Sequence, residues 1–296
     1  MDLIQLKLFV DVARSKSFSR AARANYITQP SVSLRIKQLE DELGVRLFDR
    51  TARQVQLTPE GHALISEAEK IMEQCNHFAE YVSMLKGSPS GDIRIATIPS
   101  VGMYHLGEYL KRFLNLYPNI HFNLQYRNSG VIYDLLAAKK IDAGLVAYPE
   151  KRTGLDVNVF AEEPLVLAVN RQHPLSAKKT VSLNDLEGQD FISFEENIPT
   201  GAAIDKILKQ HSIKVNYVMT NNNIDAIKHA VEAGLGMAIV PALTVEQERK
   251  LKTLAVIKIK ENIPPRPIAL LAAETTASIP LNLFKEVLIG TQENKN

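Results

Sequence analysis

Residues 18–50 read FSRAARANYITQPSVSLRIKQLEDELGVRLFDR, and this stretch contains the clearest structural signal in the chain. Thr28 is a good N-cap, and Gln29 and Pro30 suit a first helical turn, where a missing amide proton does little harm. Gly44 tolerates a positive φ and therefore ends the helix. Between these ends, apolar residues spaced four, three and four positions apart form one buried face: Val32, Ile36, Leu39 and Leu43.

Two shorter helices are predicted before this one. The first is amphipathic and buries Leu6, Phe9, Val10 and Ala13. The second is capped by Ser17 or Ser19 and contains small side chains that permit a close helix crossing: Ala21, Ala22 and Ala24. Together the three segments predict a helix-turn-helix, although any small helical domain would show a similar periodicity. DNA is therefore the first partner to consider.

The next segment, residues 46–58, has the pattern of a two-stranded wing. Its apolar residues can pack inward, and Val55 and Leu57 alternate with glutamines. Arg50 and Arg53 on such a hairpin would reach phosphates or a minor groove, or else would be ordinary solvated charges. The first 58 residues hold ten basic and six acidic side chains, a net charge of +4 in a chain whose total is +2. A positive field at the predicted DNA-reading helix favours phosphate binding.

A long helix follows Thr58 and Pro59, which form another capped start. Its apolar positions alternate by four and three residues, as in a coiled-coil seam: Leu64, Ala68, Ile71, Cys75, Phe78, Val82 and Leu85. Such a seam predicts a dimerisation helix, with a core helix of its own domain as the alternative. A dimer would present two recognition helices to a near-palindromic operator. Cys75 is then expected to be a small packed apolar group rather than a reactive thiol.

Length and composition limit the protein class. A chain of 296 residues, 45% hydrophobic and 23% charged, is typical of about two globular domains. No apolar run approaches a membrane span and no signal peptide is evident, so a cytoplasmic protein without membrane contact is expected. One cysteine excludes an internal disulfide framework. The seven histidines show no metal-ligand spacing, and no nucleophile lies within a motif, so neither a metal, a cofactor nor an enzyme is predicted.

After a linker at residues 88–91 the pattern becomes that of an α/β domain with mostly parallel strands. Strands are predicted at residues 93–98, 121–126, 143–146, 165–169, 191–194, 216–219, 237–240 and 268–272. Helices are predicted at residues 103–116, 132–139, 202–211 and 224–233, with a last helix near the C-terminus. The chain is expected to cross between two similar halves near Glu163 and to return near Pro264, Pro265 and Pro267.

Residues 18–50, followed by LTPEG at residues 57–61, resemble the signature of the LysR-type transcriptional regulators. The resemblance covers the whole chain and implies a multi-domain fold: an all-α winged helix-turn-helix with a linker helix, then an α/β two-lobed effector domain similar to type 2 periplasmic binding proteins. It also implies a homotetramer that contacts RNA polymerase and responds to a small metabolite bound between the lobes. The implied parts are a DNA-binding domain (1–58), a linker helix (59–87), a hinge (88–91) and an effector domain (92–296). Lobe I would comprise 92–162 and 267–296, and lobe II 163–266.

The resemblance also implies the DNA-reading residues. Gln29, Pro30, Ser31 and Ser33 match groove-facing positions, and Arg50 and Arg53 match the wing. Leu34 departs from the pattern, because many members have arginine there, and we expect it to contact a thymine methyl group. The predicted DNA-binding set is Thr28, Gln29, Pro30, Ser31, Ser33, Leu34, Arg35, Lys37, Arg50 and Arg53.

In the effector domain the resemblance points to loops at strand ends, where ligands of open α/β sheets bind. The predicted effector-binding set is Pro99, Ser100, Val101, Arg127, Asn128, Ser129, Phe194, Thr200, Asn222 and Ile224. Ser100 and Thr200 are expected to hydrogen-bond the effector, or merely to cap their helices. A small carboxylate is favoured, with Arg127 as its counter-charge. A solute-binding protein would explain only the part after Gly91 and would need export, so a ligand-responsive transcription factor explains the chain best.

Overall fold

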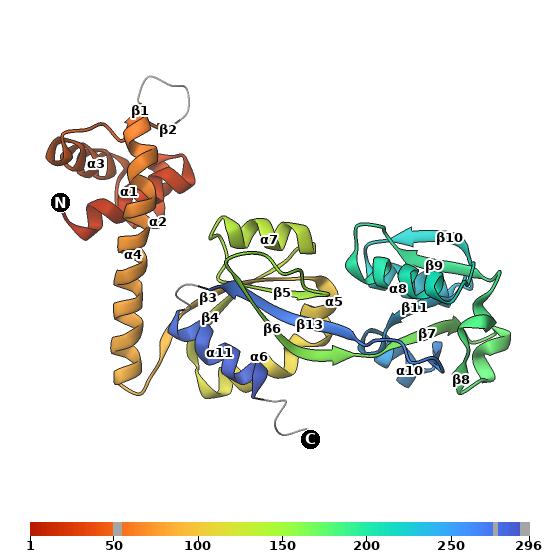
Figure 1. The fold of residues 1–296 in the computed structure, drawn as a ribbon. Helices are drawn as coiled ribbons and strands as arrows, with labels where there is room; N and C mark the ends of the chain where they lie inside the picture. The colour runs from red at the N-terminus through yellow and green to blue at the C-terminus, as the bar shows by residue number, and fades with distance from the viewer. Residues whose placement is uncertain (50–54, 275–277, 291–296) are drawn as a thin grey trace. The chain divides into compact units, whose positions relative to one another are not determined.

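The computed structural model describes residues 1–49, 55–274 and 278–290, which fall into two compact units, Met1–Lys86 and Gly87–Asn296 (Figure 1). The first unit contains α1 (Leu3–Ser15), α2 (Phe18–Ala24), α3 (Gln29–Leu43), β1 (Phe48–Asp49), β2 (Gln56–Leu57) and α4 (Pro59–Leu85). In the described part of the chain, no helix combines the length and the apolarity that crossing a bilayer requires.

The buried face of α3 is largely as predicted. Val32, Ile36 and Leu39 are fully buried among residues of α1 and α2, and Gly44 ends the helix with a φ of 70°. Leu43 is 40% exposed, so its assignment to the buried face was wrong. It occupies the last position of α3, where the chain turns away from the three-helix core.

Ser17 caps α2, because its side chain accepts a hydrogen bond from the Arg20 amide. This settles the choice between Ser17 and Ser19. The small residues Ala21 and Ala22 are buried in the core that α1, α2 and α3 share, whereas Ala24 is exposed. The predicted three-helix unit is therefore present.

The wing is a hairpin of β1 and β2, which pair antiparallel with Phe48 opposite Leu57. Phe48 anchors the hairpin, because its ring packs edge-on against the rings of Phe9 and Phe18. The distances between ring centroids are 5.6 Å to Phe9 and 5.5 Å to Phe18. The hairpin prediction is confirmed, while Arg50 and Arg53 lie outside the described residues.

Helix α4 begins against this hairpin. The Thr58 hydroxyl donates to the Arg46 carbonyl at 2.5 Å and accepts from the Gly61 amide at 3.0 Å. A Cβ atom at position 61 would lie 2.2 Å from the Leu47 carbonyl oxygen, so only glycine allows α4 to approach the chain this closely.

The second unit contains a first lobe built on a five-stranded sheet of order β4-β3-β5-β13-β6. Its strands are β3 (Ser90–Thr97), β4 (Asn119–Tyr126), β5 (Ala143–Ala147), β6 (Leu155–Glu163) and β13 (Arg266–Ala273). Helices α6 (Leu106–Leu116) and α11 (Ile279–Ile289) pack on one face, and α7 (Ser129–Ala137) packs on the other (Figure 1). The short α5 (Pro99–Tyr104) follows β3.

The remaining strands and helices of this unit form the second lobe around one apolar core. A four-stranded sheet has the order β11-β7-β12-β8, and β9 pairs with β10 beside it. The strands are β7 (Leu165–Asn170), β8 (Thr180–Val181), β9 (Asp190–Phe194), β10 (Asn216–Asn221), β11 (Ala238–Pro241) and β12 (Leu254–Ile259). The helices are α8 (Pro199–Gln210), α9 (Ile224–Glu232), α10 (Glu246–Leu251) and the 3₁₀ turns η1 (Pro174–Ala177), η2 (Leu183–Leu186) and η3 (Ala242–Val245).

Four sequence expectations about this unit need correction. The strands are not mostly parallel, because β13 is antiparallel to both its neighbours and β7 is antiparallel to β11 and β12. Strands β6, β8 and β12 and helix α10 were missed. The helix predicted over residues 103–116 is two helices that meet at His105. The expected hinge is half strand, since β3 begins at Ser90 and pairs with β4 from that residue on.

Candidate functional site

The face of α3 opposite its buried residues presents most of the predicted DNA-binding side chains. Thr28, Gln29, Pro30, Leu34 and Lys37 are exposed. Ser31 and Ser33 are half-buried and are tied to their neighbours, because the Gln29 amide donates to the Ser33 hydroxyl at 2.7 Å and the hydroxyl oxygens of Thr28 and Ser31 lie 2.9 Å apart. The sequence-predicted surface therefore forms one polar face interrupted by Leu34.

Arg35 lies differently from the other predicted residues of α3. Its guanidinium is 3.8 Å from the carboxylate of Asp2, the residue that caps α1. This long ion pair turns Arg35 toward the start of α1, and both side chains remain partly exposed.

Glu40 is a buried acid for which the sequence analysis predicted no structural role. Its carboxylate accepts hydrogen bonds from the amides of Leu47 and Phe48 at 2.8 and 3.2 Å, which ties α3 to the start of the wing. One signal for its burial was available, because Glu40 stands four residues after the core residue Ile36 on the same helical face.

In the second unit, a cavity of about 40 Å³ lies where the two lobes meet. Its lining residues include eight of the predicted effector-binding residues: Pro99, Ser100, Asn128, Ser129, Phe194, Thr200, Asn222 and Ile224. Two predicted residues lie elsewhere. Val101 is fully buried in the core of lobe I, and Arg127 is exposed and donates to the Tyr126 carbonyl at 2.8 Å.

Six further residues line the cavity and were not predicted from the sequence. They lie at the starts of helices or at the ends of strands: Ile98, Ala147, Ile198, Pro199, Pro241 and Arg266. Arg266 matters most for chemistry because it is charged and fully buried. It begins β13, well over a hundred residues after Ser100, so no local pattern places it beside the other lining residues. Among the described residues, no cluster of three metal-ligating side chains is present.

The alternative role of Ser100 and Thr200 as helix caps is wrong. The N-caps of α5 and α8 are Ile98 and Ile198, and neither makes a side-chain capping bond. Ser100 and Thr200 instead stand in the first turn of each helix and line the cavity.

Glu163 and Arg266 form a buried ion pair behind the cavity. They face each other across β6 and β13, and Arg266 Nη1 donates to Glu163 Oε2 at 2.8 Å. Glu163 also contacts His105 Nε2 at 2.9 Å and accepts from the Leu243 amide at 2.9 Å. Burial by itself would raise the pKa of the Glu163 carboxyl, but the His105 hydrogen bond and the Arg266 charge bring that pKa below its ordinary value.

A second polar contact joins the lobes at the end of α5. The Tyr104 hydroxyl donates to Asp225 at 2.7 Å and accepts from Lys228 at 2.8 Å. Burial by itself would lower the pKa of Lys228, but hydrogen bonds with Glu248, Tyr104 and Asp225 raise that pKa, so the ammonium stays charged. Helix α5 therefore carries a cavity residue at its start and a cross-lobe contact at its end.

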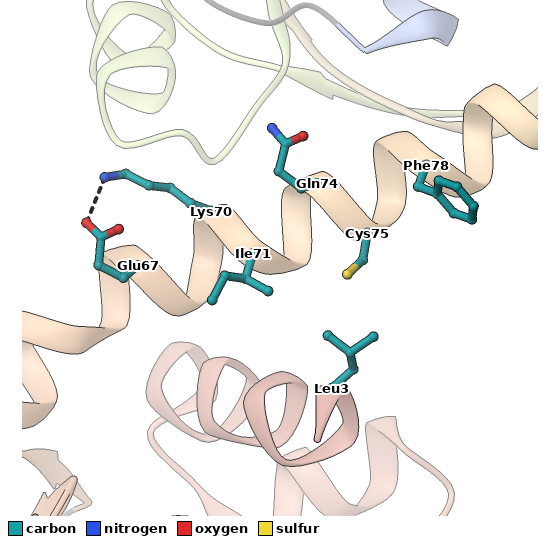
Figure 2. Close-up of a pocket in the computed structure, with 7 residues that line it drawn as sticks. All are labelled: Leu3, Glu67, Lys70, Ile71, Gln74, Cys75 and Phe78. Carbon is teal, nitrogen blue, oxygen red and sulfur yellow. Dashed lines mark hydrogen bonds and ion pairs between the residues drawn. The ribbon is translucent and has the colours of Figure 1, made fainter. Parts of the chain in front are cut away.

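The first unit has a separate apolar groove between α4 and the start of α1. Figure 2 shows Ile71 and Cys75 on the side of α4 that faces Leu3, with Phe78 further along the helix and the Glu67–Lys70 pair on the side away from Leu3. The groove measures about 520 Å³ and is open to solvent, and Phe78 is 71% exposed. Exposed apolar side chains on one helix face are the usual mark of a contact surface.

Comparison with known proteins gives the family. A family model for the bacterial regulatory helix-turn-helix protein, lysR family, matches residues 3–62, and the LysR substrate binding domain model matches residues 86–291. The chain belongs to the LysR family. This LysR protein is a transcriptional regulator with a helix-turn-helix unit and an effector-binding unit, and its relatives are regulators rather than enzymes.

Two relatives illustrate the similarity. The probable RuBisCO transcriptional regulator of Thalassiosira pseudonana is 33% identical over 270 residues, which cover 88% of this chain and 87% of that protein. The transcriptional activator CmpR of Synechocystis is 32% identical over 258 residues, which cover 87% of this chain and 84% of that protein. The solved structure of a mutant OxyR from Corynebacterium glutamicum shares the fold, with a TM-score of 0.72 at 24% identity over 99% of this chain and 93% of that one.

Proposed function

We propose that this LysR protein binds a near-palindromic operator as a dimer through α3 and changes its effect on transcription when a small molecule binds between its lobes. The observation that carries the proposal is the cavity, because residues from both lobes line it. A ligand in that position would change the relation between the lobes, which is the kind of structural change that a ligand can bias.

The proposed DNA-reading surface is the exposed face of α3, with Arg50 and Arg53 of the wing as further contacts. Exposed Gln29 and Lys37 and the neighbouring serines supply hydrogen-bond donors and acceptors for groove edges and phosphates. Leu34 is 58% exposed in the middle of this polar face, which supports a contact with a thymine methyl group.

A gel shift on DNA upstream of the gene tests this surface. Affinity should fall steeply as salt rises, because neutralised phosphates release counterions. Selection of binding sites by the wild type and by Leu34→Arg should then return different preferred bases, with Gln210→Arg, an exposed change at the end of α8, as a charge-matched control. Identical preferred sequences for the wild type and Leu34→Arg would exclude base contact by Leu34.

The proposed effector is a small carboxylate held by hydrogen bonds from Ser100 and Thr200. Promoter footprints with and without candidate metabolites test this assignment and show whether the protein activates or represses. Ser100→Trp or Thr200→Trp should keep operator binding and lose the metabolite response, whereas loss of both activities would indicate a folding defect. An unchanged metabolite response in both variants would place the effector elsewhere.

The apolar groove of α4 supports dimerisation through this helix. Phe78→Glu should convert the dimer to a monomer in analytical ultracentrifugation, because a carboxylate would be buried without a partner at the contact. The matched control is Asn76→Glu, an exposed position off the apolar seam. A dimer that survives Phe78→Glu would move the interface away from this groove.

The remaining parts of the proposal follow the family. They are a homotetramer built from two such dimers, contact with RNA polymerase, a cytoplasmic location and the division into domains at 1–58, 59–87 and 92–296. Lobe I would then be formed by 92–162 and 267–296, and lobe II by 163–266. The antiparallel pairing of β6 with β13, which brings Glu163 opposite Arg266, supports a crossing between the lobes at these two residues.

A further inference from the structure

Arg266 is the charged residue that the structure brings to the cavity. It is 1% exposed, and it is the one ionisable side chain among the described residues that line the cavity. A charged group is removed from water in this way only when nearby groups compensate for the lost hydration.

The guanidinium of Arg266 is held on two sides. Nη1 donates to Glu163 and Nη2 donates to the Ser100 hydroxyl oxygen at 2.7 Å. The third donor, Nε, is buried and has no partner. Glu163 is itself fixed by His105 and by the Leu243 amide, so the position of the guanidinium is rigidly determined.

The contact with Ser100 orients a hydroxyl group. Because the Ser100 oxygen accepts from Arg266, its own proton is free to be donated to another acceptor. A hydroxyl that accepts from a cation is also polarised and becomes a stronger donor. Ser100 lines the cavity, so an acceptor atom of a ligand can take this proton.

Other donors converge on the same space from both lobes. Helices α7 and α8 begin at Ser129 and Pro199, two lining residues, and neither helix has a side-chain cap on its free amide groups. The positive ends of both helix dipoles therefore meet the cavity. No carboxylate is among the described lining residues, and Glu163, which lies behind the cavity, is compensated by Arg266, His105 and the Leu243 amide.

We propose that Arg266 and Ser100 form one recognition unit for an oxyanion group of the effector, in which Arg266 supplies the charge and orients Ser100, and the Ser100 hydroxyl donates to the anion. This inference rests on the proposed function, because it names the chemistry of the same cavity. It assigns the counter-charge to Arg266 instead of the exposed Arg127. The cavity has room for about three water molecules, so it accepts one carboxylate or phosphate group, and a larger effector requires the lobes to separate.

The test uses the full-length protein with two simple probes, sodium acetate and sodium phosphate, against sodium chloride at equal ionic strength. Binding to the folded state raises the melting temperature, and the stabilisation grows with the logarithm of one plus the ratio of ligand concentration to Kd, so a concentration series gives the affinity. We expect one of the two oxyanions to stabilise the wild type. Stabilisation by acetate would indicate a carboxylate effector, and stabilisation by phosphate would indicate a phosphate-containing effector. Arg266→Lys should weaken that binding by at least about tenfold, since lysine lacks the planar fork. Arg112→Lys, an exposed change on α6, should leave it unaltered.

Ser100→Ala provides a second variant that removes little volume and tests the unit without disturbing the ion pair. If the two residues act together, the double variant Ser100→Ala/Arg266→Lys should lose less affinity than the product of the two single losses. Independent, multiplicative losses would overturn the coupling. We expect the Arg127→Lys variant to bind the oxyanion more tightly than the Arg266→Lys variant. The reverse order would show that Arg127, and not Arg266, is the counter-charge.

Thr200→Trp separates failure of this inference from failure of the proposed function, because it fills the cavity while Arg266 and Ser100 keep their own side chains. If Thr200→Trp abolishes oxyanion binding and Arg266→Lys does not, the cavity is the binding site but Arg266 does not recognise the oxyanion. If Thr200→Trp leaves oxyanion binding unchanged, the anion binds elsewhere. Both the cavity as the effector site and the role of Arg266 are then rejected. If neither oxyanion stabilises the wild type, the inference is overturned, and the footprints with metabolites then judge the cavity.

Discussion

The DNA-reading face of α3 and the cavity of the second unit differ in how their residues come together. The face of α3 is one segment of 15 residues, and most of its predicted side chains are exposed. The cavity draws its residues from the ends of β3, β5, β9 and β11 and from the start of β13, with helix starts between them. Helical periodicity determines the first surface, whereas the second depends on the packing of two lobes.

The difference extends to the buried acids that support each site. Glu40 ties α3 to the wing over a separation of seven or eight residues, while Glu163 holds Arg266 across a separation of 103 residues. The DNA-binding unit is therefore organised by near neighbours, and the cavity is organised by contacts between distant parts of the chain. Substitutions in the two units should affect stability separately, and four predictions test this.

The largest effect is expected from Glu163→Gln. It leaves the charge of the buried Arg266 without a partner, which typically costs about 3–5 kcal/mol. Hydrogen–deuterium exchange should rise in peptides of β6, β13 and α5 and stay constant in α1 and α3. Glu162→Gln is the matched control, because Glu162 is the adjacent exposed acid. Equal changes in both units would show that they unfold as one.

Ile36→Ala should have the next largest effect, this time in the first unit. Ile36 is fully buried at the centre of the three-helix core, and such truncations cost about 2–5 kcal/mol. Exchange should increase in α1, α2 and α3 but not in the three sheets of the second unit. Gln38→Ala, on the exposed face, is the control. An increase in exchange confined to α3 would mean that the three helices do not form one cooperative core.

Glu40→Ala should destabilise the wing by about 1–3 kcal/mol, because it leaves the amides of Leu47 and Phe48 buried without an acceptor. Denaturant unfolding of the full-length protein measures the loss, with Asp41→Ala as an exposed control. Operator affinity should fall with it. Normal affinity and stability would show that the wing keeps its place without Glu40.

The smallest effect concerns pH and sharpens the first prediction. The pKa of Glu163 is lower in the folded protein than its ordinary value of 4.5, so its stabilising contribution is complete above that pH. As the pH falls through the lower folded-state pKa, the contribution is lost. The difference in urea midpoint between the wild type and Glu163→Gln should therefore be constant near neutral pH and shrink under acid conditions. A difference that grows with acidity would contradict the ion pair.

Several features of the second unit were predictable to different degrees. Strand β5 and the first residues of α9 were recognisable because apolar runs and periodicity are local properties. Strand β6 was missed although its first five residues read LDVNV, in which apolar and polar residues alternate as in a strand. The expectation of mostly parallel strands was wrong because an α/β alternation does not reveal strand direction: β13 returns to lobe I as expected, but it lies between β5 and β6 and runs antiparallel to both.

The sequence by itself determined the helix-turn-helix and the apolar seam of α4, because each depends on spacing or capping within a few turns of chain. Only the tertiary structure decided that Arg266 lies behind Ser100, that Arg127 lies outside the cavity and that Tyr104 joins the lobes. The physical reason is that these contacts join residues far apart in the chain, whose meeting depends on strand order and lobe packing and leaves no local pattern.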